Sequence, residues 1–195
     1  MPPDDSATVD LDRLRAVLLR RPDGGEPVVE AGAERGAPVA AAVLFPIVLS
    51  ERGTTVLLTR RTEHLRDHPG QIGFPGGHVE AGDPSPEHTA LREAKEEIGL
   101  APRHVEIVGF LPEYHTATGY RITPVVGFLT PPFTLRPDPS EVAEIFEAPL
   151  SFLLDPANRQ RHMREYRGKT RDFFAIPYEG HFIWGATAGI IVSLA

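Results

Sequence analysis

Three glutamates are clustered in the segment Arg92–Leu100, which reads REAKEEIGL. At about 100° per residue, a helix would place Glu93, Glu96 and Glu97 within one arc of roughly 100°. Side chains at such spacings have Cβ atoms about 5–6 Å apart, so two of these carboxylates repel by about 3 kcal/mol at an effective dielectric near 20. Arg92 can offset part of this repulsion as the i,i+4 partner of Glu96. A divalent cation would offset more, and Mg²⁺ prefers carboxylate and water oxygens together with substrate phosphates.

The helix that would position these carboxylates has a signal at each end. Ser85 can cap its N-terminus, Pro86 stands at the first helical position and Gly99 can end it. Residues next to the carboxylate arc are mostly apolar: Ala90, Leu91, Ala94 and Ile98. We therefore predict a helix over 86–98 that packs one side into the core. The alternative is a solvated acidic helix face, which is the usual role of adjacent glutamates.

The rest of the chain alternates between strand and helix patterns. Apolar runs and turn residues predict strands at Val39–Leu49, Thr54–Thr59, Glu106–Leu111, Ile122–Leu129, Glu141–Phe146 and Asp172–Ile176. Helices are predicted at Val9–Leu19, where Asp10 can act as the cap, at Ser151–Leu154 and at Ile183–Leu194. The Gly- and Pro-rich stretch Pro22–Gly36 is predicted to be a linker or long loop. Interspersed helices and strands indicate an α/β or α+β protein built in layers.

The composition excludes several classes of protein and of functional site. The 195 residues have room for one well-buried core, and the formal net charge of −7 argues against a general nucleic-acid-binding surface. The chain has no cysteine, which excludes disulfides, zinc–thiolate sites and thiol nucleophiles. No signal peptide pattern and no apolar run near ~20 residues is present. We expect a cytoplasmic protein with a small-molecule substrate and with neither nucleic acid nor membrane as partner. The oligomeric state stays open, a homodimer included.

The glutamate segment resembles the signature of the Nudix hydrolase family, Gly-x5-Glu-x7-Arg-Glu-U-x-Glu-Glu-x-Gly-U, where U is a bulky aliphatic residue. Gly77 matches the first position, and the end of the signature is matched by Arg92, Glu93, Ala94, Glu96, Glu97, Gly99 and Leu100. Asp83 stands in place of the first Glu, and eight residues rather than seven separate it from Arg92. Ala94 is also smaller than the usual aliphatic residue. These departures suggest an unusual branch of the family.

The resemblance implies an α/β/α sandwich with a mixed sheet and a metal-dependent pyrophosphatase that uses Mg²⁺ or Mn²⁺. Glu93 and Glu97 would be the first metal ligands, and Glu96 would be a further ligand or the base for the attacking water. The backbone carbonyl of Gly77 would complete the coordination. Residues 1–37 would then be an N-terminal helix and linker, and residues 38–195 the Nudix hydrolase domain.

A second block, LLTRRT at residues 57–62 followed by Arg66, Gly70 and FPGG at residues 74–77, resembles a motif of coenzyme A pyrophosphatases. Thr62 replaces the Ser or Ala of that motif. The resemblance implies that coenzyme A or a derivative is hydrolysed to 3′,5′-ADP and 4′-phosphopantetheine. Arginine presents a bidentate fork to phosphate, and coenzyme A carries a 3′-phosphate besides its diphosphate. The predicted substrate-binding residues are Arg66, Arg61, Arg60, Gly70 and Phe74.

Two other functions stay open. One is a Nudix hydrolase with another substrate, such as ADP-ribose, a dinucleotide, capped RNA or an oxidised nucleotide. The other is a non-catalytic nucleotide-sensing module, although this chain keeps all three signature carboxylates.

Several further residues have two interpretations each. Tyr114 and His115 suit either an ordinary loop role or a substrate contact, and Glu141 and Glu144 either a structural role or a further carboxylate near the metals. Trp184 fits a core position better than a base-stacking platform. His78 is predicted to lie on a strand face.

Overall fold

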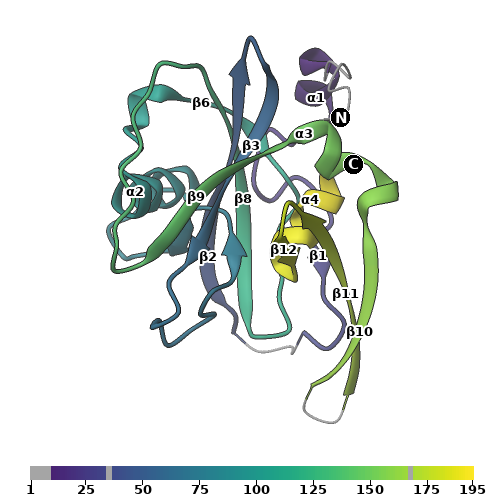
Figure 1. The fold of residues 1–195 in the computed structure, drawn as a ribbon. Coiled ribbons are helices and arrows are strands. Elements are labelled where there is room, and N and C mark those ends of the chain that lie inside the picture. Colours follow the sequence, from purple (N-terminus) through teal and green to yellow (C-terminus); the bar gives the residue numbers. More distant parts are fainter. Residues whose placement is uncertain (1–9, 34–36, 167–168) are drawn as a thin grey trace.

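The computed structural model describes residues 10–33, 37–166 and 169–195. A mixed sheet forms its centre, with the strand order β1-β7-β8-β2-β3-β4, while β5 pairs with β2, β6 with β8 and β9 with β3 (Figure 1). Its strands are β1 (Val28–Val29), β2 (Val39–Ser50), β3 (Gly53–Arg61), β4 (Ile72–Gly73), β5 (Gly76–His78), β6 (Val105–Phe110), β7 (Tyr114–His115), β8 (Tyr120–Leu129) and β9 (Val142–Pro149). The pairs β2–β8 and β1–β7 are parallel and the others are antiparallel.

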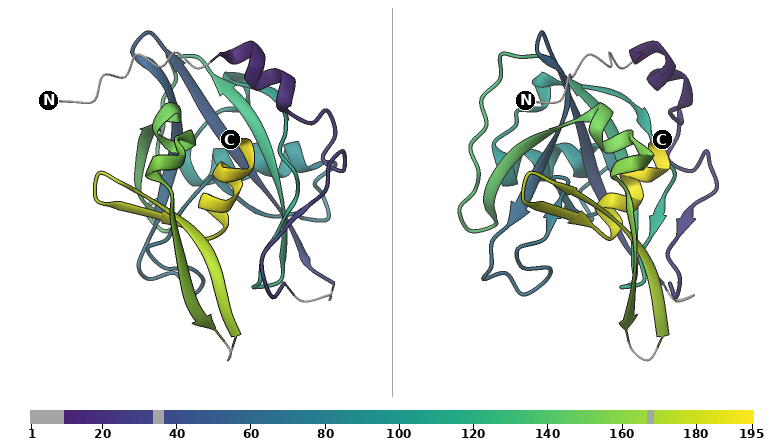
Figure 2. Two further views of the ribbon diagram at one scale, coloured as in Figure 1. Left: turned by 90° about the vertical axis from the view of Figure 1, so that its right-hand side faces the viewer. Right: turned by 45° about the vertical axis from the view of Figure 1, so that its right-hand side comes forward.

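A second, antiparallel sheet contains β10 (Gln160–Tyr166), β11 (Lys169–Tyr178) and β12 (His181–Trp184). Strands β10 and β11 form a long ribbon that projects from the rest of the molecule (Figure 2). The helices are α1 (Leu11–Val17), α2 (Pro86–Ile98), α3 (Leu150–Leu154) and α4 (Ala186–Leu194), with single 3-10 turns at Pro102–His104 and Pro156–Asn158. No helix in the described ranges is both long and apolar enough to cross a membrane.

The main sheet separates two hydrophobic cores. Leu44, Leu57 and Val125 pack with α2 on one face, while their neighbours Phe45, Leu58 and Val126 pack with α1, α3 and α4 on the other. Successive side chains of a strand point to opposite faces, so strands that are buried on both faces have continuous apolar sequences. This is why Val39–Leu49 contains so few polar residues. Helices on both sides of a mixed sheet confirm the predicted α/β/α sandwich (Figure 1).

Most predicted elements are confirmed, with shifts of one to three residues at many ends and a longer strand β11. The helix over 86–98 is present with the predicted caps: the Ser85 hydroxyl accepts the His88 N–H, and Gly99 is left-handed at φ 68°. The helix predicted over Ile183–Leu194 is confirmed for Ala186–Leu194, and the prediction is wrong only for its first residues. Strand β12 ends at Trp184, and Gly185 turns the chain into α4 at φ 64°, ψ −138°. Strand β10 was not predicted because its sequence, QRHMREY, is almost entirely polar.

Helix α1 packs onto the main sheet, and β1 pairs with β7 at its edge. Asp10 caps α1 by accepting the N–H groups of Asp12 and Arg13, and Leu14 and Leu18 are buried in the core. The interpretation of Pro22–Gly36 as a linker or long loop is wrong in part, because Val28–Val29 pairs with β7. Residues 34–36 of that stretch lie outside the described residues. The division of the chain at residue 37 stays a prediction.

Deleting residues 1–36 should therefore destabilise the protein. The deletion exposes the surface that Leu14 and Leu18 cover, and burial of two leucines contributes about 3–6 kcal/mol. Thermal unfolding should show a clearly lower Tm, whereas deleting only residues 1–6 should leave Tm and activity unchanged. Equal Tm values for both deletions would mean that the contacts of α1 and β1 contribute no stability.

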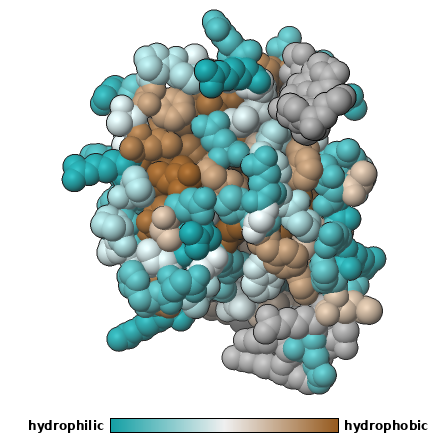
Figure 3. All heavy atoms as spheres, viewed as in Figure 1, coloured by the Kyte–Doolittle hydropathy of each residue, from teal (hydrophilic) through white to brown (hydrophobic). Residues whose placement is uncertain are grey.

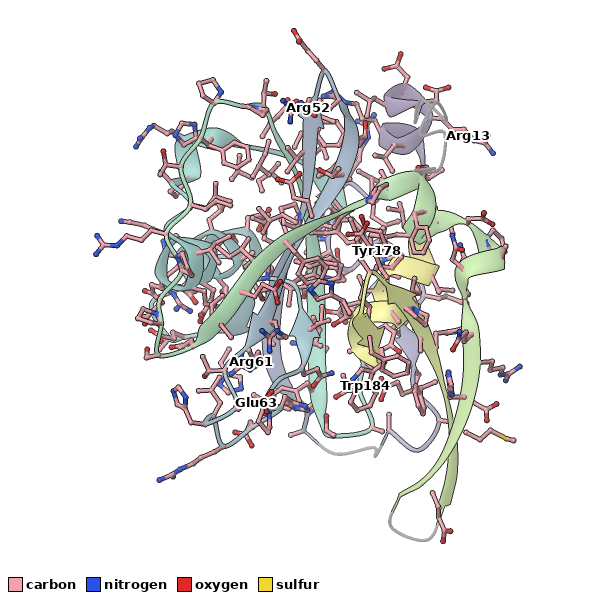
Figure 4. The ribbon with its side chains drawn as sticks, in the orientation of Figure 1. Arg13, Arg52, Arg61, Glu63, Tyr178 and Trp184 are labelled. Atoms are coloured by element: carbon pink, nitrogen blue, oxygen red, sulfur yellow. The ribbon has the colours of Figure 1, made fainter. Side chains whose placement is uncertain are left out.

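On the surface, hydrophilic side chains mark much of the outline of the molecule, with apolar areas between them over the sheet and helices (Figure 3). Arg61 and Trp184 are both labelled in the lower part of Figure 4, on opposite sides of it.

Candidate active site

A cavity of about 700 Å³ opens beside the carboxylate helix. Helix α2 contributes Glu93 and Glu97 to its lining, and β5 contributes Gly76, Gly77 and His78. The end of β3 and the loop after it contribute Arg61, Asp67 and His68, and the start of β9 is preceded by Glu141, which also lines the cavity. Volumes of about 300–1,000 Å³ are usual for small-molecule sites.

The three signature glutamates differ in burial. The side chain of Glu97 is 5% exposed, that of Glu93 17% and that of Glu96 59%. Glu97 accepts the Gly76 N–H at 3.2 Å and lies 3.8 Å from Arg61 Nη1. Burial raises the pKa of Glu97 to about 8, against the opposing effects of that N–H and of Arg61. Burial also raises the pKa of Glu93. Two carboxylates that are costly to ionise thus face the cavity.

Arg92 connects the carboxylates to the loop before the helix. Its guanidinium donates to Glu93 at 2.8 Å and to Glu96 at 3.1 Å, which confirms the predicted i,i+4 pair. It also binds both carboxylate oxygens of Asp83, at 2.9 and 3.2 Å. The same guanidinium holds the pKa of Asp83 well below its usual range. Asp83 therefore anchors Arg92 from the place where the signature has its first glutamate.

Two glycines let β5 lie close to its neighbours, Gly77 to α2 and Gly76 to β2. A Cβ on Gly77 would lie 2.5 Å from a Glu93 carboxylate oxygen, and a Cβ on Gly76 would lie 2.5 Å from the Ala42 carbonyl oxygen and 2.6 Å from Val43 Cα. Gly76 therefore meets fixed backbone of β2, its partner in the sheet.

Gly76→Ala should cost about 1–3 kcal/mol of stability or more, because the new methyl group overpacks against backbone that cannot yield. The matched control is Gly82→Ala, where a Cβ would meet no atom within 4 Å. That change should stay within about 0.5 kcal/mol of the wild type. Chemical denaturation of both variants measures the difference, and equal stabilities would contradict the close approach of β5 to β2.

Comparison with known proteins identifies the family. A family model described as the NUDIX domain matches residues 38–167. The chain belongs to the Nudix family. Relatives from Enterobacter sp. (strain 638) and Escherichia coli (strain K12 / DH10B) are 44% and 45% identical over 155 and 156 residues, which is 80% of each chain in both alignments. Both are described as "Uncharacterized Nudix hydrolase NudL".

A solved structure supports the fold. The Ap4A hydrolase of C. elegans, in a binary complex, superposes with a TM-score of 0.50 at 20% identity, over 57% of this chain and 80% of that chain. That likeness bears on the fold alone. Membership of the Nudix family makes the chain a Nudix pyrophosphatase that acts on nucleoside diphosphate derivatives. Nudix hydrolases generally use a divalent cation, typically Mg²⁺ or Mn²⁺.

The oxygen-bearing groups that line the cavity are of the kind that bind such a cation. Hard cations prefer carboxylate and carbonyl oxygens, and Glu93, Glu97, Glu141 and Gly77 all line the cavity. As the side chains stand, the described residues contain no group of three His, Asp or Glu placed to share one ion. Arg92 binds Glu93 and Glu96 in this arrangement. A cation held by Glu93 would therefore compete with that guanidinium.

The predicted substrate-binding residues have different positions. Arg61 lines the cavity, and its buried Nε has no partner among the described residues. Arg60 instead pairs with Glu144 of β9 at 2.9 Å. Arg66 is exposed on the loop whose next residues, Asp67 and His68, line the cavity. Phe74 is buried against Phe45 and also lines the cavity, and Gly70 turns the loop at φ 66°.

Of the residues that had two interpretations, some line the cavity and others contact neighbouring side chains. Glu141 lines the cavity, whereas Glu144 accepts from Arg60 and lies 3.2 Å from His181. Tyr114 belongs to β7 and is buried beside Glu30, and burial raises its pKa well above the usual range. His115 lies 3.5 Å from Glu113. His78 is on β5, as predicted, and stacks with Tyr120.

The core position predicted for Trp184 is wrong, because this side chain is only partly buried and lines the cavity. The sequence interpretation also missed Glu30, Tyr120 and Phe173, which line the same cavity. No local pattern marks these residues. They come from segments far from the signature and meet it only in the folded chain.

Proposed function

We propose that this Nudix enzyme hydrolyses the diphosphate linkage of coenzyme A or a derivative and releases 3′,5′-ADP and 4′-phosphopantetheine. One observation carries the proposal. Arg61, Phe74, Gly76 and Gly77, from the block that resembles coenzyme A pyrophosphatases, line the same cavity as the signature carboxylates. This shared lining supports the proposal that the block and the signature contact one bound molecule.

In this proposal Glu93 and Glu97 hold Mg²⁺ or Mn²⁺ together with the carbonyl oxygen of Gly77. When bound, such a cation neutralises charge on phosphoryl oxygens and lowers the pKa of water. Gly76 orients Glu97 through its N–H, at 3.2 Å. Glu96, which accepts from Arg92 at 3.1 Å, stays the candidate for a further ligand or for the base that takes the proton of the attacking water.

Arg61 has a separate role in binding the substrate. Its partly exposed guanidinium lines the cavity, with Nη1 3.8 Å from Glu97, and a guanidinium that donates to phosphate oxygens forms a strong, charge-assisted contact. Arg66 is proposed to bind the 3′-phosphate from the rim, because it is exposed on the loop whose next residues, Asp67 and His68, line the cavity.

Product analysis tests the substrate. Coenzyme A, ADP-ribose and a dinucleoside polyphosphate are each incubated with the enzyme and Mg²⁺ or Mn²⁺, and the products are separated by chromatography. The proposal expects the highest kcat/KM for coenzyme A, with 3′,5′-ADP and 4′-phosphopantetheine as the products. A higher kcat/KM for ADP-ribose or the dinucleotide would overturn it and leave a Nudix hydrolase of another specificity.

A further inference from the structure

Part of the cavity wall comes from segments outside residues 38–167, the range that the family model matches. Glu30 and Ala31 follow β1, Asp172 and Phe173 belong to β11, and Trp184 ends β12. Figure 4 shows Trp184 on the opposite side of the lower region from Arg61. The family domain thus contributes the signature carboxylates, and its flanking segments help to complete the site.

The indole of Trp184 is oriented by its neighbours, but its ring is partly exposed and its N–H is available to a ligand. The chain turns sharply at Gly185, directly after it, and α4 begins at Ala186. The Phe173 ring meets the indole edge-on, with centroids 5.5 Å apart and planes at 63°. Within the described residues no group accepts a hydrogen bond from the indole N–H. A partly exposed, oriented aromatic ring with an unused donor is a common feature of ligand-binding surfaces.

Charge restricts what this wall can bind. Its ionisable members are the carboxylates of Glu30 and Asp172. Glu30 accepts the Ala117 N–H at 2.7 Å, and Asp172 accepts from Arg161 at 2.6 Å. The Arg161 guanidinium offsets the charge of Asp172, so Glu30 gives this wall its acidic character. A carboxylate repels phosphate and accepts hydrogen bonds from amino groups. The aliphatic side chains of Ile122 and Ile190 line the same cavity. An uncharged aromatic ring that carries an amino group suits these surroundings better than a phosphate does.

We propose that Trp184, supported by Phe173, is the surface on which the nucleobase of the substrate stacks, and that the acidic rim favours a base with an exocyclic amino group. This inference rests on the proposed function in that it assumes a nucleotide substrate with such a base. It assigns base recognition to the segments that flank the family domain.

Tryptophan fluorescence tests the stacking without relying on turnover. Trp184 is the only tryptophan of the chain, so its emission reports on this wall alone. Adenosine monophosphate and 3′,5′-ADP should quench the emission saturably, whereas ribose 5-phosphate and 4′-phosphopantetheine should not. Free N-acetyltryptophanamide, titrated in parallel, corrects for absorption by the nucleotides. Quenching by phosphopantetheine and not by the nucleotides would overturn the proposal.

Variants give the second measurement. Loss of base–aromatic stacking should raise KM for coenzyme A, and Kd for 3′,5′-ADP, by about 5- to 150-fold in Trp184→Ala, with kcat changed much less. Trp184→Phe should recover most of the affinity, and it also checks folding if the alanine variant is unstable. The matched control is Phe182→Ala, an exposed aromatic residue on the same strand, which should leave KM unchanged.

These outcomes separate the two proposals. Saturable quenching by 3′,5′-ADP in an enzyme that fails to cleave coenzyme A would keep the stacking surface and remove the coenzyme A substrate. Efficient cleavage of coenzyme A with no quenching, and with an unchanged KM in Trp184→Ala, would keep the substrate and remove the stacking surface.

Discussion

Replacing Glu93 or Glu97 with glutamine is expected to lower kcat/KM by about 100-fold or more, the loss that follows removal of one group stabilising charge in a transition state. Both carboxylates line the cavity on one edge of α2, and glutamine keeps their shape but removes the negative charge that a divalent cation requires. Steady-state kinetics at saturating Mg²⁺ and Mn²⁺ measure the effect. Activity above a tenth of the wild-type value in both folded variants would contradict the metal role.

Stability separates this catalytic role from a structural one. Glu97 is buried next to Glu93, so neutralising either group removes a cost of burying charge. Without metal, both variants should have a Tm no lower than that of the wild type. The matched control is Glu87→Gln, the same chemical change in the first turn of the same helix, which should keep its activity. A large drop in Tm for the two site variants would instead indicate a structural role.

Coenzyme A is expected to be hydrolysed roughly 10- to 150-fold more efficiently than dephospho-coenzyme A. The two substrates differ by the 3′-phosphate, and a hydrogen bond to a charged group contributes about 1.5–3 kcal/mol. Arg66→Ala should remove most of this preference while changing turnover of dephospho-coenzyme A much less. Ratios of kcat/KM for both substrates measure the effect.

Arg52→Ala is the matched control for Arg66→Ala. Arg52 is also exposed but lies at the end of the molecule far from Arg61 (Figure 4), so its loss should leave the preference intact. If Arg66→Ala also retains the full preference, another residue binds the 3′-phosphate. Arg61, inside the cavity, would then be the next arginine to replace.

The features that could be predicted from the sequence are those that depend on residue types and on short-range spacing. Ser85, Pro86 and Gly99 act within one turn of their own helix, so the bounds of α2 followed from residue types alone. The spacing of Glu93, Glu96 and Glu97 placed them on one arc for the same reason. The apolar runs of β2, β3 and β8 indicated strands, and their alternation with helix patterns indicated the layered fold.

The tertiary structure decided what each of these residues faces. Glu97 is buried and Glu96 mostly exposed because β5 packs against one side of α2, and helical spacing cannot indicate which side that is. Arg60 and Arg61 are adjacent, yet one pairs with Glu144 and the other lies beside Glu97. Neighbouring side chains of a strand alternate between faces, and the register between β3 and β9 shifts at these two residues.

The part of the cavity wall outside residues 38–167 depended entirely on long-range packing. Glu30, Phe173 and Trp184 lie far from the signature in sequence, and no periodicity or spacing relates them to it. They meet around one cavity because β1 pairs with β7 and because the turn at Gly185 directs β12 into α4. Residue types and spacings act locally, so they identify the chemistry of the carboxylate helix, whereas the shape of the substrate site depends on contacts between distant segments.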